Sequence, residues 1–231
     1  MPDQHTEDFI VIQLDLDPYP ALAVFENMRA RLRKPTMTTQ DFFAAIERNQ
    51  LSPGRVYRRE DLTKVTGAVD RNLSELMKSG ILKKVAPGLY YQPKASRFGN
   101  LPPDDHQLVE AFLRDKHFLM FSPSAYNSVG AGTTQLYNST VVYNHKRHGV
   151  FKLGNREFNF KVKPRFPKKL TAEFLFVDLL NNLNELAEDQ TEVLRHARSR
   201  LPELNSARLK DAMQSYGSVA TRKRIASWLN A

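Results

Sequence analysis

The sequence predicts an α+β protein in two parts. Three observations lead to this prediction. Two short helical patterns and two β-rich runs follow one another between residues 54 and 91. Alternating apolar and polar residues between 150 and 162 predict a hairpin, and apolar residues recur at helical spacing after residue 172. At 231 residues the chain is long enough for one large domain or two small ones.

The first helical pattern covers residues 59–65 and opens with two acids, which the helix dipole favours. The second begins at Ala68, carries one apolar stripe and ends at Gly80. Two β-rich runs, 81–82 and 89–91, flank a loop that contains Pro and Gly. Helix, turn, helix and hairpin in this order predict a winged helix-turn-helix. Its second helix can enter the major groove while the hairpin lies along the phosphates.

Charge favours nucleic acid as the partner of this domain. Residues 51–100 contain ten Lys or Arg and four acids, a net charge of +6. Glu75 either accepts a hydrogen bond from a cytosine amine or is a solvated helix residue. The candidate DNA-binding residues are Arg71, Ser74, Glu75 and Lys78 on the second helix, Lys83 and Lys84 on the hairpin, and Arg55, Arg58 and Arg59 on the flank.

Charge and the distribution of Pro and Gly indicate where the other parts of the chain begin and end. Residues 1–17 carry five acids and no Lys or Arg, so we expect an acidic flexible arm over 1–20. The winged helix-turn-helix, with an extra N-terminal helix, is expected over 21–93, and its first helix starts at a capping pattern at Thr38. Residues 94–103 are rich in Pro and Gly and predict a linker. Residues 104–231 then form a basic C-terminal domain of an antiparallel β-hairpin and helices.

Within this C-terminal domain we expect a helix over 104–115, strands at 118–121 and 140–143, and a hairpin of 150–153 with 157–162. Residues 145–170 contain nine Lys or Arg and one acid, a net charge of +8. A basic hairpin either contacts a phosphate backbone, of DNA or RNA, or discourages aggregation at a sheet edge. The candidate residues of this C-terminal basic surface are Lys146, Arg147, Lys152, Arg156, Lys161 and Lys163.

The sequence argues against catalysis. There is no cysteine, and the six histidines are scattered or stand in a basic loop, so no metal site and no cofactor is expected. The acidic and Lys motifs of nucleases, the paired aspartates of nucleotidyltransferases and a phosphate-binding Gly-rich loop are all incomplete. The sequence contains neither a long apolar run nor a secretory signal, so we expect a cytoplasmic protein without membrane contact.

Several motifs in fixed order resemble the AbiEi-type antitoxins of type IV toxin–antitoxin systems. They are GLYYQP (88–93), RFG (97–99), LPP (101–103), SAYN (124–127) and GTTQ (132–135), followed by the basic hairpin. The resemblance runs from about Thr38 to the C-terminus. It implies that the winged helix binds inverted repeats in double-stranded DNA of its own promoter and represses the operon. It also implies that the C-terminal domain counteracts a partner nucleotidyltransferase toxin without a stable complex.

Two other interpretations stay open at this point. The first is a protein-interaction module, in which the winged helix is structural and the basic surface binds an acidic partner. The second is a diverged nucleic-acid enzyme. Strong salt dependence of binding to duplex DNA would separate regulator from interaction module, and metal-dependent turnover would identify the enzyme.

Overall fold

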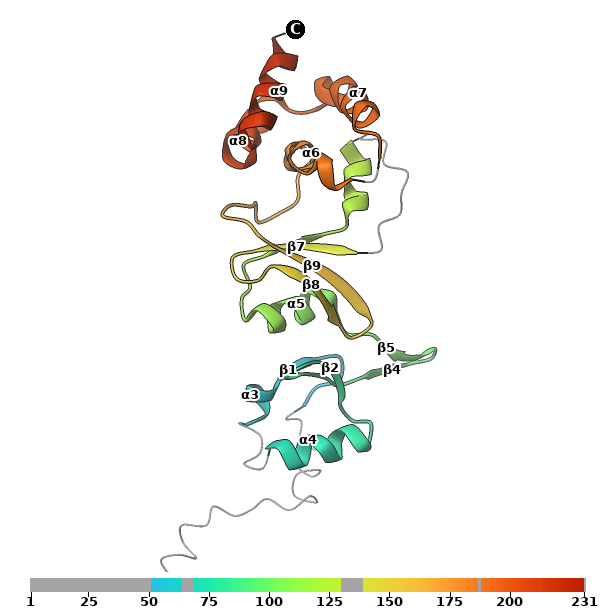
Figure 1. The fold of residues 1–231 in the computed structure, drawn as a ribbon. Coiled ribbons are helices and arrows are strands. Elements are labelled where there is room, and N and C mark those ends of the chain that lie inside the picture. Colours follow the sequence, from blue (N-terminus) through green and yellow to red (C-terminus); the bar gives the residue numbers. More distant parts are fainter. Residues whose placement is uncertain (1–50, 64–68, 130–138, 187, 231) are drawn as a thin grey trace, which may run out of the picture.

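The computed structural model describes residues 51–63, 69–129, 139–186 and 188–230. These residues form an elongated α+β molecule in three levels, namely an N-terminal unit, a central sheet and a group of C-terminal helices (Figure 1). The predicted α+β class is thus confirmed. The predicted acidic arm over 1–20, the extra N-terminal helix and the helix starting at Thr38 lie outside the described residues.

The N-terminal unit contains two helices and a three-stranded antiparallel sheet. Its elements are β1 (Val56–Arg58), α3 (Arg59–Leu62), α4 (Val69–Lys78), β2 (Lys83–Ala86) and β3 (Leu89–Tyr91). The sheet order is β1-β3-β2, with β3 in the centre. The apolar stripe predicted for α4 forms its buried face, which includes Leu73 and Leu76, and these leucines pack in one cluster with Tyr57 and Tyr90 of the sheet.

One strand of the predicted hairpin is displaced along the sequence. We expected it at residues 81–82, but β2 begins at Lys83. Gly80, at a φ of 76°, ends α4, and the backbone N–H of Leu82 donates to the Leu76 carbonyl at 3.1 Å. Leu82 is only 1 % exposed. Residues 81–82 therefore complete the end of the helix, and Lys83 and Lys84, which follow the run where we expected the strand, are the first residues of β2.

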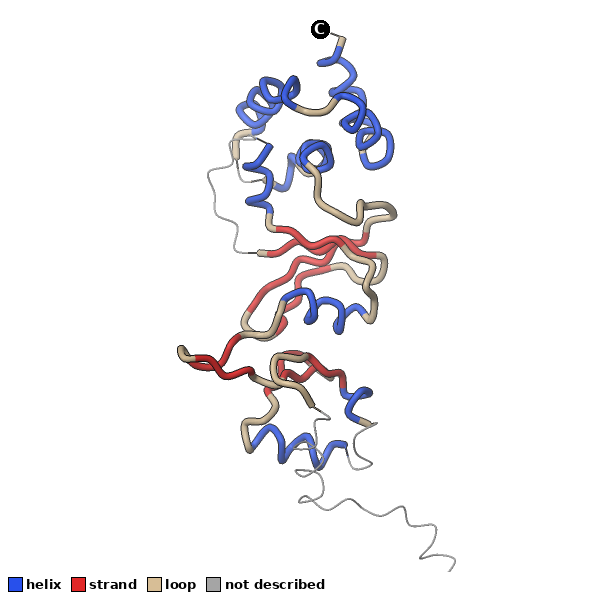
Figure 2. Tube along the Cα trace, turned by 180° about the vertical axis from the view of Figure 1, so that it is seen from behind, coloured by secondary structure: helices blue, strands red, loops and turns tan. Residues whose placement is uncertain are grey.

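Most of residues 94–103, which we expected to be a linker, form secondary structure. Lys94–Ser96 (β4) and Gly99–Leu101 (β5) pair antiparallel as a separate two-stranded hairpin. This hairpin projects sideways from the molecule, and the front and back views agree on its direction (Figures 1 and 2).

The central sheet has four strands in the order β6-β7-β9-β8. These are β6 (Leu119–Phe121), β7 (Thr140–Asn144), β8 (Gly149–Leu153) and β9 (Arg156–Val162). The predicted hairpin is the antiparallel pair β8–β9, whereas β7 and β9 pair in parallel, which we did not expect. Phe158 and Phe160 of β9 are fully buried and Val150 of β8 is 58 % exposed. Strand β9 lies inside the sheet, between β7 and β8, and β8 lies at the edge.

Helices cover both faces of this sheet. Helix α5 (Asp105–Leu113) starts at Asp104, whose side chain accepts from the backbone N–H of Gln107 at 2.9 Å. The 3₁₀ segment η2 (Pro123–Val129) follows β6. Helix α6 (Ala172–Asn181) covers the face opposite α5 (Figure 1).

The C-terminal helices lie beyond α6. They are α7 (Gln190–Arg200), α8 (Ser206–Tyr216) and α9 (Val219–Leu229), with short 3₁₀ segments η3 (Leu183–Glu185) and η4 (Leu201–Glu203). The predicted helical spacing after residue 172 is confirmed. Among the residues that the structure describes, no helix is both long and apolar enough to cross a bilayer.

The N-terminal unit and the C-terminal domain share a core. Val56 and Tyr91 of the first sheet pack in one cluster with Leu108 and Val109 of α5 and Phe158 of β9. In addition, the backbone N–H of Gly154 donates to the Val85 carbonyl at 2.6 Å. This shared core fixes the small sheet and α4 relative to the central sheet.

Candidate nucleic-acid interface

The outer face of α4 carries polar side chains opposite its buried stripe. Arg71, Ser74 and Lys78 are exposed, at the i, i+3 and i+7 positions of one helix face. Ser74 donates to the Asp70 carbonyl at 3.1 Å, and Lys78 lies 3.5 Å from the carboxylate of Glu75. Arg71 has no acidic partner within the described ranges, so its guanidinium is available to a ligand.

Strand β2, at the edge of the small sheet, carries two further candidate residues. Lys83 and Lys84 are both exposed, opposite Tyr91 and Tyr90 of β3. Neither lysine makes an ion pair with any residue in the described part of the chain. The structure therefore brings Arg71, Lys83 and Lys84 onto one unit as solvated cations, which is what phosphate contacts require.

The three flanking arginines differ from one another. The Arg55 side chain is exposed, with its guanidinium 5.6 Å from the ring centroid of Tyr57. Arg58 lies 3.5 Å from Asp61. Arg59 donates twice to the carboxylate of Asp70, at 2.9 and 2.7 Å. Arg55 is thus the flanking arginine without a carboxylate partner among the described residues.

The Arg59–Asp70 pair ties α3 to the first turn of α4. The hydrogen bonds from the Arg59 guanidinium lower the pKa of the Asp70 carboxyl below its usual range. The same pair raises the pKa of Arg59. Arg59 therefore positions α4, and its charge is already balanced by a carboxylate.

The predicted C-terminal basic surface is largely committed to contacts within the chain. Lys146 lies 3.1 Å from the Asp115 carboxylate and donates to the Arg114 carbonyl at the end of α5. Arg147 lies 4.5 Å over the Phe112 ring, and the Lys163 ammonium lies 5.2 Å from the Tyr143 ring centroid. Arg156 pairs with Asp105, and Lys161 pairs with Glu185. Within the described residues, only Lys152 of the six predicted cations has no such partner.

The sequence did not predict a buried cluster of hydrogen-bonded polar side chains in the C-terminal domain. Tyr126 and Tyr143 donate to the Asp178 carboxylate at 2.8 Å each, and Asn182 donates to the Tyr143 hydroxyl at 3.2 Å. Burial raises the pKa of Asp178 and of both tyrosines. The cluster links η2, β7 and α6. The residues lie 35 to 52 positions apart, so no local pattern could have indicated it.

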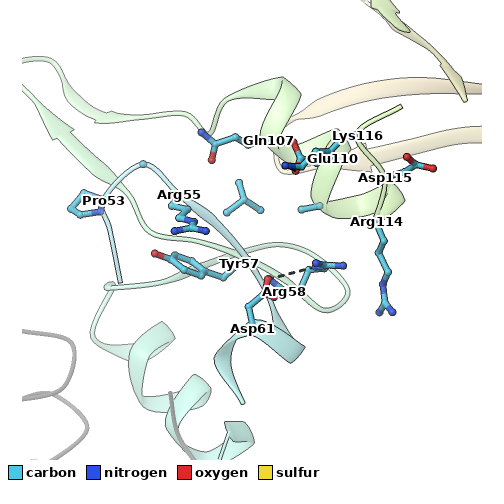
Figure 3. Close-up of a pocket in the computed structure, with 13 residues that line it drawn as sticks. Pro53, Arg55, Tyr57, Arg58, Asp61, Gln107, Glu110, Arg114, Asp115 and Lys116 are labelled. Atoms are coloured by element: carbon cyan, nitrogen blue, oxygen red, sulfur yellow. Dashed lines mark hydrogen bonds and ion pairs between the residues drawn. The ribbon is translucent and has the colours of Figure 1, made fainter. Parts of the chain in front are cut away.

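A cleft of about 1200 Å³ separates the small sheet from α5 (Figure 3). Its charged lining is mixed, with four cations and three acids, and Arg114 at its edge pairs with Glu60 across the two parts. The cleft lining consists of residues 53–58, 61, 107, 110, 111 and 114–116. Such a balanced lining selects neither anions nor cations. No three His, Asp or Glu side chains of the described residues lie close enough to hold a metal ion.

Comparison with known proteins gives two similarities. A family model described as the VapC50 C-terminal domain matches residues 6–52, which associates the chain with toxin–antitoxin proteins. The match spans most of the predicted acidic arm and the helices expected after it. The fold is similar to the crystal structure of the RV2827C protein from Mycobacterium tuberculosis, with a TM-score of 0.50 and 15 % identity over 81 % of this chain and 74 % of that one. No curated protein matches the sequence significantly.

Proposed function

We propose that this chain is an antitoxin-like transcriptional regulator that binds double-stranded DNA through its N-terminal unit. One observation supports this most strongly. The exposed face of α4 and the edge strand β2 present Arg71, Lys83 and Lys84 without acidic partners in the part of the chain that the structure describes. Unpaired cations on an exposed helix and on the hairpin that follows it are the kind of groups that contact a groove and its bordering phosphates.

The order of the elements supports a winged helix for this unit. Strand β1 is followed by α3, α4 and the hairpin β2–β3, and β3 pairs with both other strands. In such a domain α4 is the recognition helix and the turn at 87–88 is the wing. Arg71 and Ser74 would contact base edges, and Lys83, Lys84 and Arg55 would contact phosphates.

The antitoxin role rests on two independent similarities. The sequence motifs between residues 88 and 135 resemble AbiEi-type antitoxins, and residues 6–52 match a domain of the VapC50 family. We infer that the protein represses its own operon at inverted repeats. The C-terminal domain would counteract a nucleotidyltransferase-type toxin without a lasting complex, and the chain itself would not be an enzyme.

The test is binding of the purified full-length protein to a labelled fragment of its own upstream region. A scrambled duplex of equal length and composition is the control, and both are titrated at several salt concentrations. We expect a preference on the order of 1,000-fold for the natural fragment. Equal and salt-sensitive binding to both would reduce the protein to a general nucleic-acid binder and contradict autoregulation.

A protein-interaction module is the second candidate, and one groove favours it. An open groove of about 650 Å³ lies between helices α7 and α9. Its apolar lining includes Leu194 and Trp228, and its basic lining consists of Arg195, Arg198 and Arg224. Such a groove suits an acidic segment with apolar anchors. Retained affinity of an Arg198→Glu, Arg224→Glu variant for a copurifying acidic protein would contradict this assignment.

A further inference from the structure

The hairpin β4–β5 places an aromatic side chain fully in solvent. Phe98, between the two strands, is 101 % exposed, whereas the next most exposed large apolar residue in the described ranges is Val219 at 62 %. An exposed phenylalanine adds nothing to the core, and its apolar surface is available for burial against a partner. The fold itself therefore gives no reason for a large aromatic residue at this tip.

The hairpin holds this tip in one conformation. The Ser96 hydroxyl donates to the Gly99 carbonyl at 2.6 Å and accepts from the backbone N–H of Phe98 at 3.2 Å. Gly99 has a φ of 103°, which a residue with a side chain rarely adopts. At the base, the Tyr91 hydroxyl donates to the Leu101 carbonyl at 2.8 Å. A tip that is ordered before binding loses little conformational entropy when it binds.

Charge and position relate the hairpin to the candidate DNA surface. Residues 93–101 include Lys94 and Arg97 and no acid. The base of the hairpin and strand β2 share a cavity of about 270 Å³, lined by Lys83 and Lys84 on one side and by residues 93, 100 and 101 on the other. The hairpin is thus a basic two-stranded ribbon that starts beside the two lysines expected to contact phosphates.

We propose that the tip of this hairpin enters the minor groove of the DNA bound by α4 and inserts Phe98 between two base pairs. Apolar wedges on basic ribbons unstack a base step and kink the duplex toward the major groove. Arg97 lies against the groove wall, where the phosphates of both strands are near. This inference rests on the proposed DNA-binding function and adds a second contact that bends the operator.

The experiment uses the full-length chain and its own upstream fragment, with 2-aminopurine substituted at successive adenines to report unstacking. The parent protein should raise fluorescence at one step and bend the fragment in a circular-permutation assay. Phe98→Ala should abolish both signals and weaken binding about 10-fold, because the buried ring contributes part of its transfer free energy. Phe98→Leu keeps a wedge and should retain most of the signal.

Two controls separate the hairpin from the recognition helix. Val150→Ala removes another exposed apolar side chain, on β8, and should change nothing. Arg71→Ala should weaken binding but leave the unstacking signal at saturating protein. If Phe98→Ala binds, bends and unstacks like the parent, the hairpin inference is wrong while DNA binding stands. If the parent protein binds its own upstream fragment no more tightly than a scrambled duplex, both the proposed regulatory function and the hairpin inference are wrong.

Self-association is the remaining alternative for the tip. Sedimentation of parent and Phe98→Ala protein without DNA measures it directly. An unchanged sedimentation coefficient supports the minor-groove contact. Conversion of a parental dimer to a monomer would assign Phe98 to a contact between two copies of the chain and overturn the inference.

Discussion

The small sheet with α4 and the central sheet with its hairpin are both basic in sequence, yet their charges serve different purposes. Residues 145–170 carry the larger net charge, +8, against +6 for residues 51–100. In the central sheet, Arg156 and Lys161 have carboxylate partners and Arg147 and Lys163 lie over aromatic rings. Of the candidate binding cations, Arg71, Lys83 and Lys84 of the N-terminal unit have no such partner in the described residues, whereas among the six of the central sheet only Lys152 has none.

The comparison of the two regions shows that the net charge of a sequence segment does not measure how much of that charge is available to a ligand. The partners of Arg156 and Lys161 are Asp105 and Glu185, which are 51 and 24 positions away. A count of charges over a short stretch of sequence therefore includes the cation but not the carboxylate that neutralises it. A cation that already has a carboxylate must give up that contact before it neutralises a phosphate, so we expect paired residues to stabilise the fold and free residues to bind.

Removal of the carboxylate at the centre of the buried cluster should give the largest effect on the C-terminal side. Asp178→Ala leaves the hydroxyls of Tyr126 and Tyr143 without their acceptor, at about 1–3 kcal/mol for each buried unsatisfied group. We expect the free energy of unfolding in urea to fall by about 3 kcal/mol. Affinity for DNA should be unchanged at temperatures where the variant is folded.

Asp178→Asn is the matched variant, since its amide keeps an oxygen acceptor in the same place. It should lose much less stability than the alanine variant. A loss below about 1 kcal/mol for Asp178→Ala would show that the two hydroxyls find other acceptors, and the cluster would then have no structural importance.

On the N-terminal side, Arg71→Ala should weaken operator binding by about 1–3 kcal/mol, roughly 5- to 150-fold, and relax the base preference near α4. The thermal midpoint should not change, because the guanidinium makes no ion pair in the described ranges. Fluorescence anisotropy with the natural and a base-substituted fragment measures both quantities. Lys161→Ala is the matched control, and we expect it to bind DNA like the parent protein.

Equal losses from Arg71→Ala and Lys161→Ala would remove the distinction between the two regions. The Lys161–Glu185 pair would then open in the presence of DNA, and the central sheet would join the interface. A small loss of stability in Lys161→Ala without a loss of affinity would support the distinction.

The sequence predicted where helices and strands form better than it predicted which strands pair with each other. The helical stripe through Leu73 and Leu76 and the alternation through Phe158 and Phe160 each correspond to an observed element, because local periodicity depends only on which face is buried. The parallel pairing of β7 with β9 was not predictable, since periodicity says nothing about which strand lies alongside. The fold of residues 94–101 was hidden by the prolines that flank them, at 93, 102 and 103, although Ser96 and Gly99 are residues typical of turns.

For the candidate site, the sequence predicted which side chains of α4 are exposed. It predicted only in part which of the cations form ion pairs within the chain. Helical spacing placed Arg71, Ser74 and Lys78 together, and the structure agrees. The pairing of Arg59 with Asp70 joins two helices across a turn, and helical spacing within one helix does not describe such contacts.

A smaller effect should separate two lysines of equal charge. Lys84→Ala removes one expected phosphate contact, so the slope of log affinity against log salt should flatten by about one unit, with the same loss for every DNA sequence. Lys163→Ala should leave that slope unchanged, because its ammonium lies over the Tyr143 ring. Titrations at four or more salt concentrations measure both slopes. A flatter slope for Lys163→Ala would place the C-terminal surface on the DNA.

The smallest expected effect comes from the pair that joins α3 to α4. Since Arg59 lowers the pKa of Asp70, the pair stabilises the folded state above the ordinary carboxyl pKa of about 4, and this contribution is lost as the pH falls through the lower folded value. The unfolding free energies of the parent and Asp70→Asn should therefore differ slightly at pH 7 and converge once the pH falls below the lowered pKa of Asp70. A constant difference at all pH values would mean that Arg59 holds α4 through shape and not through charge. In that case Asp70→Asn should also leave DNA binding unchanged, because α4 would keep its position without the ion pair.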